Sequence, residues 1–457
     1  MEPTHIRFGG GATETILNPL VAVWMVVAIV LILTLPRRSL ITCFLVSCLC
    51  IPVAQVVVLG GVHFTVLRIL IIAGMIRMLM ERGSATARRF VGGVNDVDKV
   101  VVLWTLSQLV VFSLQWMDSQ ALIHNLGDFV DAFGGYLVVR FLITDREGIR
   151  RTVATLAVIC AIQGVCMVSE QITHVNVFGY LGGHTVITIR DGKPRSEGVM
   201  GCLYAGAFAG ASIPLFLWLW KGGKSRLLAC AGLAGAIAMA IASNSSTSLL
   251  ALGGSLVGLA FWPLRKQMRL VRWALSLTLV GLHMVMNGPV WSLIARIDLT
   301  GSSSGYHRYY LVDNCIRHFS DWWLLGYKYY NDWGWDMWDL CNQFVVAALG
   351  GGLLTLVFYV AIFSRSFGAI GIARKQVNGN RAEWLLWCLG SDLFANVVAH
   401  FGINYMAQMM MTLFPLLACI SIAALEARQT IPKPAESSEQ AQLAAPSEAE
   451  NMFWQSA

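Results

Sequence analysis

Two polar segments, about 171–197 and 289–341, interrupt long apolar runs and carry the chain's best candidates for chemistry. The first contains TIRDGKPRSEG, with Arg190 and Arg195, and the second contains GYHRYY, with Arg308. A guanidinium group binds phosphate oxygens through paired N–H donors. These arginines are therefore candidate ligands of a pyrophosphate group, beside which an acid or base would activate an acceptor hydroxyl.

The second polar segment is also rich in aromatic residues. Residues 317–342, RHFSDWWLLGYKYYNDWGWDMWDLCN, hold five tryptophans, three tyrosines and four aspartates. Aromatic rings stack on the apolar faces of sugars, and they also anchor loops at the headgroup level of a membrane. We expect Trp333 and Trp335 to position a sugar substrate or the loop, with Arg317 supplying charge nearby. An amphipathic cap held at the interface explains the same composition.

The composition places these segments in a membrane protein. The 457 residues are 56% hydrophobic and 13% charged, whereas soluble chains carry about 25% charged residues. The net charge of +7 does not predict nucleic-acid binding, because most Lys and Arg residues lie in short links between apolar runs. The first apolar run lacks a cleavage pattern, so we expect a retained membrane helix and not a signal peptide.

The apolar runs predict an all-α polytopic membrane protein. A span needs about 20 mostly apolar residues, which gives roughly 12–13 transmembrane helices with a large loop between the tenth and eleventh. The candidate spans centre near 16–36, 39–59, 64–80, 99–116, 122–143, 152–170, 198–220, 226–243, 247–264, 272–288, 342–364, 384–400 and 406–425.

The links between these runs alternate between basic and charge-poor. Because Lys and Arg concentrate on the cytoplasmic side of membrane proteins, the basic links predict the inner face. The segments 171–197 and 289–341 then fall on the outer face. Residues 1–427 form the predicted membrane domain, and residues 428–457, rich in Pro, Ala, Ser and Glu, are expected to be a disordered cytoplasmic tail.

Ionisable residues inside apolar runs are functional candidates by default. Arg68, near the outer end of the third span, is expected to pair with a substrate phosphate or to reach water. Arg140, near an inner end, is expected to extend to the headgroups. Asp392 and His400 lie in or at the end of the twelfth span, where internal ion pairing explains them as well as function does. Two further aspartates, Asp128 and Asp131, are candidates to line a cavity.

Three other features have structural explanations. The motif NSSTS at 244–248 reads as a tight turn rich in helix-capping groups, and Gly350–Gly352 suits close helix packing in lipid. The cysteines form no CxxC pair or Cys/His metal spacing, so we predict no metal site. A disulfide between Cys315 and Cys341 stays open.

The order of these motifs resembles the O-antigen ligase and polymerase superfamily. RDGKPRSEG leads into a small-residue span, a large outer loop carries YHR, HFSDWWLLGY, DWGW and DLCNQF, and a Gly-rich span follows. The likeness is closest to the exopolysaccharide-polymerase-like branch. It covers about residues 100–425, with specific motifs only in the two outer segments.

This resemblance implies a glycosyltransferase at the periplasmic face of the bacterial inner membrane, working without a metal or other cofactor. Arg195 and Arg308 match the arginines that contact the substrate pyrophosphate, with Arg190 as a helper. The implied partners are an undecaprenyl-pyrophosphate-linked oligosaccharide, a glycan or lipid A core acceptor, membrane lipid and a candidate chain-length regulator.

One position departs from the ligase pattern. Ligases of the superfamily carry a His-Asn pair before the span that follows the large loop, and here the pair reads Cys341-Asn342. Polymerase-like members place an Asp two or three residues before the Asn, which Asp339 matches. His307 and His318 are the other candidate bases, and Asn342 is a candidate for positioning.

The expected reaction is an inverting glycosyl transfer from the lipid-linked glycan, with polymerisation favoured over ligation by the missing histidine. A transporter or flippase of lipid-linked glycans is the alternative from another class. It predicts charges buried in mid-span and internal repeat symmetry. A non-catalytic membrane partner in polysaccharide assembly is a third hypothesis.

Overall fold

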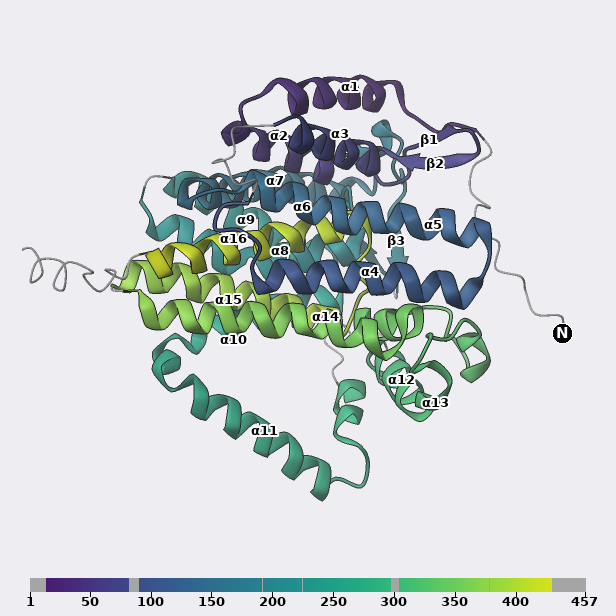
Figure 1. Cartoon of the computed structure of the whole chain (residues 1–457), viewed down its shortest axis with the longest axis vertical. Coiled ribbons are helices and arrows are strands. Elements are labelled where there is room, and N and C mark those ends of the chain that lie inside the picture. Colours follow the sequence, from purple (N-terminus) through teal and green to yellow (C-terminus); the bar gives the residue numbers. More distant parts are fainter. Residues whose placement is uncertain are drawn as a thin grey trace, which may run out of the picture.

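The computed structural model describes residues 14–81, 90–190, 192–223, 225–296, 304–377 and 379–429, and the predicted tail from 430 lies outside them. Most helices run side by side in one bundle, and the β-hairpins, α12 and α13 lie at one of its ends (Figure 1). The elements of the first part are α1 (Pro19–Thr34), α2 (Arg37–Cys50), β1 (Val56–Leu59), β2 (Val62–Thr65), α3 (Val66–Met80), α4 (Asp96–Trp116), α5 (Ser119–Phe129), the π-helix η1 (Val130–Gly134), α6 (Gly135–Leu142) and α7 (Arg146–Thr173).

The second part of the chain contains a short hairpin, β3 and β4, near its start. Its two strands are antiparallel, with Thr188 opposite Arg195 and Arg190 opposite Lys193. The elements are η2 (Val177–Leu181), β3 (Thr188–Arg190), β4 (Lys193–Arg195), α8 (Cys202–Lys221), α9 (Arg226–Ala242), α10 (Ser246–Ala260), η3 (Trp262–Gln267), α11 (Met268–Val285), η4 (Val290–Arg296), α12 (Ser304–Arg317), α13 (Phe319–Trp322), η5 (Tyr330–Trp333), α14 (Gln343–Gln376), α15 (Asn380–His400), η6 (Ala407–Met409) and α16 (Met410–Gln429).

Six helices in the described part of the chain are long and apolar enough to cross a membrane. They are α4, α7, α8, α11 together with η3, α14, and α16 together with η6. Three shorter apolar helices, α1, α9 and α10, accompany them. The prediction of an all-α membrane protein is confirmed at this level, and the exact number of spans stays a prediction.

Two predicted spans differ from a plain transmembrane helix. In the range 39–59, α2 ends at Cys50 and the chain continues into the extended strand β1. In the range 122–143, a π-helical turn, Val130–Gly134, joins α5 to α6. Such turns insert an extra residue into a helix and are frequent near functional positions.

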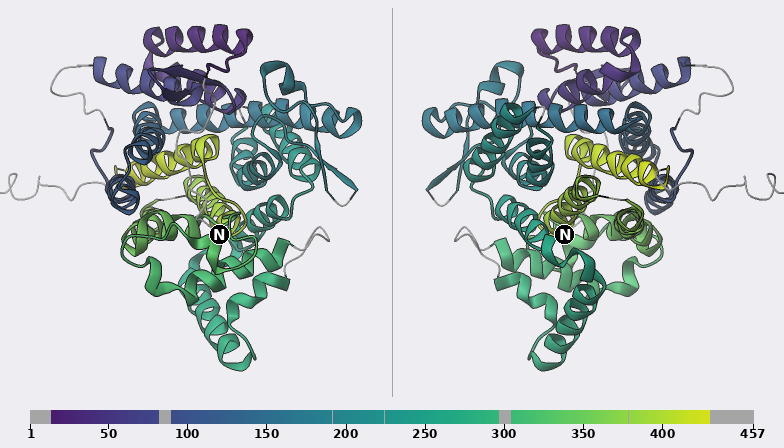
Figure 2. Two further views of the ribbon diagram at one scale, coloured as in Figure 1. Left: turned by 90° about the vertical axis from the view of Figure 1, so that its right-hand side faces the viewer. Right: turned by 90° about the vertical axis from the view of Figure 1, so that its left-hand side faces the viewer.

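The interior of the bundle is built around α16, of which almost every residue is buried. Seen along the bundle, α16 lies among the other helices, whereas α11 projects away from them (Figure 2). None of the residues of α11 is buried, which leaves its apolar side chains to lipid. Helices α7 and α9 cross so closely that a Cβ on Gly235 would lie 2.3 Å from the carbonyl oxygen of Cys160, as small residues permit in membranes.

Helix α14 is broken at Gly352, and the aromatic segment 317–342, called the aromatic loop below, enters the break. Gly352 has φ 67° and ψ −173°, a conformation that is essentially restricted to glycine. An unbroken helix would join the N–H of Leu353 to the carbonyl of Leu349. Instead, Leu353 N donates to the carbonyl of Trp323 at 2.8 Å, and Leu349 accepts from Tyr327 N at 2.8 Å. The glycine triplet, expected to serve close packing between helices, therefore opens α14 for the loop.

Side chains of α4 bind two backbone carbonyls of α14 beside the break. Gln115 Nε2 donates to the carbonyl of Leu349 at 3.0 Å, and Gln108 Nε2 donates to that of Gly350 at 3.1 Å. Backbone carbonyls that lose their helical partners inside a membrane protein are costly unless other groups bind them. The two glutamines thus fix α14 to α4 at the level of the break.

Replacing Gly352 by Ala is predicted to destabilise the protein by about 2–3 kcal/mol or more, because a non-glycine residue is strained in this region of φ and ψ. The added Cβ would also lie 2.6 Å from the carbonyl oxygen of Leu324. Thermal unfolding of the detergent-purified protein measures the effect. Gly350→Ala is the matched control, since its Cβ meets only the movable side chain of Gln108. Equal losses in both variants would contradict the special role of Gly352.

Candidate functional site

Two of the three candidate bases, His307 and Asp339, meet beside the first turn of α12. Nε2 of His307 lies 2.9 Å from the backbone carbonyl oxygen of Asp339 and 3.9 Å from its carboxylate Oδ2. The His307 side chain is 18% exposed and that of Asp339 is 55% exposed. A hydroxyl group arriving from solvent can therefore reach the Asp339 carboxylate, with the imidazole of His307 at its side.

His318 belongs to a different set of contacts. It lies eleven residues beyond His307, or about 16 Å along a helical axis. Its ring stacks on Trp333 with centroids 4.6 Å apart, and Trp333 stacks on Tyr327 at 5.1 Å. Nδ1 of His318 lies 3.2 Å from Oδ2 of Asp321. His318 therefore packs in a separate cluster of the loop, with Trp333 at the centre of the stack.

Arg308 follows His307 on α12 and is buried, with 5% of its surface exposed. Its Nη2 donates to Thr247 Oγ1 at 2.9 Å, and the guanidinium also hydrogen-bonds to Cys341. Burial and the nearby Asp339 carboxylate raise the pKa of the Cys341 thiol to about 12, although Arg308 acts in the opposite direction. Cys341 is a free thiol, as is Cys315, so the disulfide considered between them is not formed.

Arg195 ends β4 and is half-buried, whereas Arg190 lies exposed at the tip of the same hairpin. Among the described residues, the guanidinium of Arg195 forms neither a salt bridge nor a side-chain hydrogen bond, and its Nε is buried without a partner. Glu170, at the end of α7, accepts from the backbone N–H groups of Glu197 at 2.9 Å and Gly198 at 3.1 Å. The backbone after Arg195 is thus held firmly, while its charge stays available.

The junction of α9 and α10, residues 244–248 with the first turn of α10, holds both arginine-bearing segments. Asn244 Nδ2 donates to the carbonyl of Pro194 at 2.6 Å, directly before Arg195. Thr247 accepts from Arg308 and donates to the carbonyl of Gly402 at 3.2 Å. The sequence predicted only a capping turn here, and the assigned N-cap, Ser245, makes no side-chain capping bond. The signal in the sequence that could have revealed the role of residues 244–248 is the run of hydroxyl residues inside an apolar chain.

The remaining candidates fall outside this arrangement or support it indirectly. Asn342 is buried and caps α14, accepting from the N–H of Phe344 at 2.9 Å, so it positions the end of the loop. Arg317 is largely exposed and pairs with Asp313 through Nε at 2.6 Å. Trp335 is exposed on the aromatic loop. Tyr204, which sequence reasoning did not single out, lies within electrostatic range of the Asp339 carboxylate.

Three side chains at the site form a group that could hold a metal ion. The ligand atoms of His307, Asp339 and Cys341 lie within 4.8 Å of one another. Imidazole, carboxylate and thiolate are the groups that bind zinc. A coordinated metal itself deprotonates a thiol, so the raised pKa of Cys341 does not decide between the two states. The absence of a metal therefore stays a prediction.

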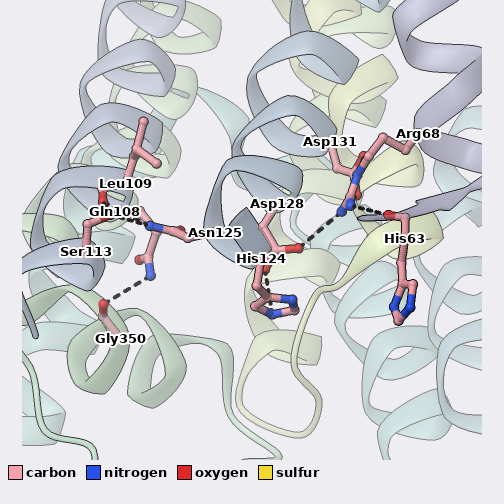
Figure 3. Close-up of polar contacts among 10 residues, drawn as sticks. All are labelled: His63, Arg68, Gln108, Leu109, Ser113, His124, Asn125, Asp128, Asp131 and Gly350. Carbon is pink, nitrogen blue, oxygen red and sulfur yellow. Dashed lines mark hydrogen bonds and ion pairs between the residues drawn. The ribbon is translucent and has the colours of Figure 1, made fainter. Parts of the chain in front are cut away.

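Arg68 pairs with Asp128 of α5 and with Asp131 of η1 (Figure 3). Its Nη2 lies 2.7 Å from Asp131 Oδ2 and 3.5 Å from Asp128 Oδ1, and Asp128 lies 3.5 Å from His124 Nε2. Arg68 also donates to the carbonyl of His63 at 3.3 Å. The two aspartates, considered as lining of a cavity, are partners of an arginine that was expected to bind phosphate or water.

Arg140 also differs from its prediction. It is only 2% exposed, and its Nε lies 3.2 Å from Oδ1 of Asp98. The side chain therefore forms an internal ion pair with α4 and does not extend to the headgroups. The carboxylate of Asp98 lies in the first turn of α4, a location that the spacing along the chain does not reveal.

Neither a protein-family model nor a curated protein matches the chain. The functional assignment therefore depends on the site residues and on the resemblance of their motifs.

Replacing Thr247 by Val is predicted to destabilise the protein by about 1–3 kcal/mol, because buried polar partners of the lost hydroxyl are left unsatisfied. The affected bonds are those to Arg308 and to the carbonyl of Gly402. Thr247→Ser keeps the hydroxyl and is expected to remain close to the wild type. Thermal unfolding in detergent compares the two variants, and a Ser variant as unstable as the Val variant would show that the methyl group, not the hydroxyl, matters.

Proposed function

We propose that this chain is an inner-membrane glycosyltransferase that polymerises an undecaprenyl-pyrophosphate-linked glycan at the periplasmic face, in O-antigen or exopolysaccharide synthesis. The observation that carries the proposal is the attachment of Arg308 and of the Arg195 hairpin to one junction, residues 244–248. Two guanidinium groups held from separate segments suit the two phosphates of a pyrophosphate leaving group. The motif resemblance supports the same reaction.

The residues divide the chemistry between charge stabilisation and proton transfer. An acceptor hydroxyl attacks the anomeric carbon of the lipid-linked glycan, and the bond from that carbon to the pyrophosphate oxygen breaks. Arg195 and Arg308 stabilise the charge that develops on the leaving pyrophosphate, with Arg190 nearby on the hairpin. Asp339 accepts the proton of the hydroxyl, and His307 is the second group within reach of that proton.

The aromatic loop gives the proposed site a surface for sugar rings. Trp323, Trp335 and Trp338 are exposed on it, while the stack around Trp333 and the break in α14 hold the loop in place. Exposed rings on a fixed backbone can bind the apolar faces of sugars at little entropic cost. The same rings can lie at the headgroup level of the membrane.

Polymerisation and ligation share this chemistry and differ in the acceptor, which is another lipid-linked glycan or the lipid A core. The free thiol at Cys341, where a ligase would carry histidine, favours polymerisation. A transporter of lipid-linked glycans is the alternative. The concentration of arginines and aromatic rings at one end of the bundle, and not at mid-span, favours the enzyme.

Arg195→Ala and Arg308→Lys are predicted to lower polymerisation about 100-fold or more, as loss of one charge-stabilising donor does elsewhere. Lys keeps the charge of Arg308 but loses its forked pair of donors. The measurement is gel analysis of surface glycan length in a strain whose own copy is deleted, together with the amount of each variant in the membrane. Unpolymerised repeat units are expected to accumulate on lipid.

Arg317→Ala is the matched control, because this arginine is exposed and pairs with Asp313 outside the site. It is expected to leave glycan length unchanged. Normal chain lengths in both site variants, at normal protein amounts, would exclude the pyrophosphate clamp. Accumulation of full-length glycan on lipid would instead identify ligation as the reaction.

A second pair of variants tests which group near the site accepts the proton. Asp339→Asn removes the carboxylate and is predicted to lower polymerisation about 100-fold or more. Cys341→Ser is predicted to change it less than twofold, because a thiol with a pKa of about 12 stays protonated at neutral pH and cannot act as the base. The same glycan gels measure both, and the reverse ranking would assign the role to Cys341.

A further inference from the structure

A small internal cavity lies among four helices of the bundle. None of its lining residues belongs to the aromatic loop or to the segments that carry Arg195 and Arg308. Its volume, about 10 Å³, holds about one water-sized sphere. Its walls are otherwise apolar, and the polar residues that line it are Thr152 of α7, Ser212 of α8, Asp392 and Asn396 of α15, and Thr412 of α16.

The carboxylate in this cavity has no cationic partner in the part of the chain that the structure describes. Asp392 is 4% exposed, and in the described part of the chain the one side chain that binds it is Asn396, whose Nδ2 donates to Oδ1 at 2.8 Å. The second oxygen, Oδ2, makes no hydrogen bond with any described residue. The nearest histidine on the same helix, His400, is eight residues away, or about 12 Å along the axis. Its two nitrogens bind Tyr359 and the carbonyl of Asn396.

The hydroxyl groups of the residues around the cavity already donate hydrogen bonds to backbone carbonyls. Thr152 donates to the carbonyl of Gly148 at 2.8 Å, and Ser212 donates to that of Phe208 at 2.9 Å. Thr412 donates to the carbonyl of Met409 at 2.7 Å. Because each proton is already donated to a backbone carbonyl, these oxygens offer lone pairs and not donors to the cavity.

A carboxylate and hydroxyl oxygens with free lone pairs form a set of oxygen ligands, which hard cations prefer. One carboxylate carries one negative charge, so a monovalent ion leaves the buried site neutral, whereas a divalent ion would leave an uncompensated charge that is expensive in an apolar interior. From this geometry we propose that Asp392 and the surrounding hydroxyls bind a monovalent cation, Na⁺, within the membrane bundle. The site is independent of the proposed glycosyl transfer.

The proposal is tested on the full-length protein in detergent at fixed pH and ionic strength, with NaCl exchanged for choline chloride. Na⁺ is expected to raise the midpoint of thermal unfolding of the wild type by about 2 °C or more, because a ligand that binds only the folded state stabilises it. Asp392→Asn keeps the shape and removes the charge, and it is expected to lose this shift. Asp96→Asn, at an exposed carboxylate paired with Lys99, is the matched control and is expected to keep it.

Equilibrium binding of radioactive ²²Na⁺ provides the second measurement. The wild type is expected to bind one ion per chain, and Thr412→Val, which removes one lining oxygen, is expected to raise the dissociation constant about tenfold or more. If Asp392→Asn fails to fold, this variant alone decides the outcome. Equal midpoints of the wild type in Na⁺ and choline, or Na⁺ binding that Thr412→Val leaves unchanged, would overturn the site and leave Asp392 as a protonated acid.

Discussion

Every backbone N–H and C=O group inside an apolar bundle needs a partner, and the break in α14 shows how this requirement organises the molecule. The two groups that one helical bond would have joined, on Leu349 and Leu353, bind instead to the backbone of the aromatic loop. The backbone of the loop therefore takes part in the hydrogen bonding of α14 and does not merely pack against its surface. Trp322 of the loop and Cys315 of α12 form one small apolar cluster with Val345, Ala348 and Leu349 in the first turns of α14, so the loop and the bundle share one set of contacts.

The same requirement positions the arginines. The carbonyl of Pro194 accepts from Asn244 at 2.6 Å and from Gln171 at 3.0 Å, which ties the hairpin to both α7 and the α9–α10 junction. Three residues after Asn244, Thr247 holds Arg308. Charged groups that must stabilise a leaving group act best when the protein has already fixed their geometry. Hydrogen bonds from the side chains of Gln171, Asn244 and Thr247 supply that fixation here, and they leave the Arg195 guanidinium unpaired among the described residues.

These two arrangements mark the limit of what the sequence reveals. The length and apolarity of the runs predict membrane helices because burial in lipid needs a fixed number of apolar residues. Arginines in polar segments predict a phosphate site because few other groups suit that ligand. The bond from Arg308 to Thr247 joins residues 61 positions apart, and no local pattern specifies it. Nor does a glycine triplet distinguish close helix packing from a broken helix, since both need a residue without a side chain.

The charged residues buried inside the bundle fall into two classes, those with a counter-charge and those without one. Arg68 lies against two aspartates, and Arg140 lies against Asp98, so each arginine meets its counter-charge on a neighbouring helix. Such pairs bring the bundle close to neutrality and need no ligand to explain them. Among the side chains that the structure describes, Asp392 is hydrogen-bonded only to the neutral amide of Asn396. Unlike Glu170, whose carboxylate accepts from two backbone N–H groups, Asp392 faces a cavity among hydroxyl residues. It needs a proton or a cation of its own to be neutral, which is the charge that the proposed Na⁺ supplies.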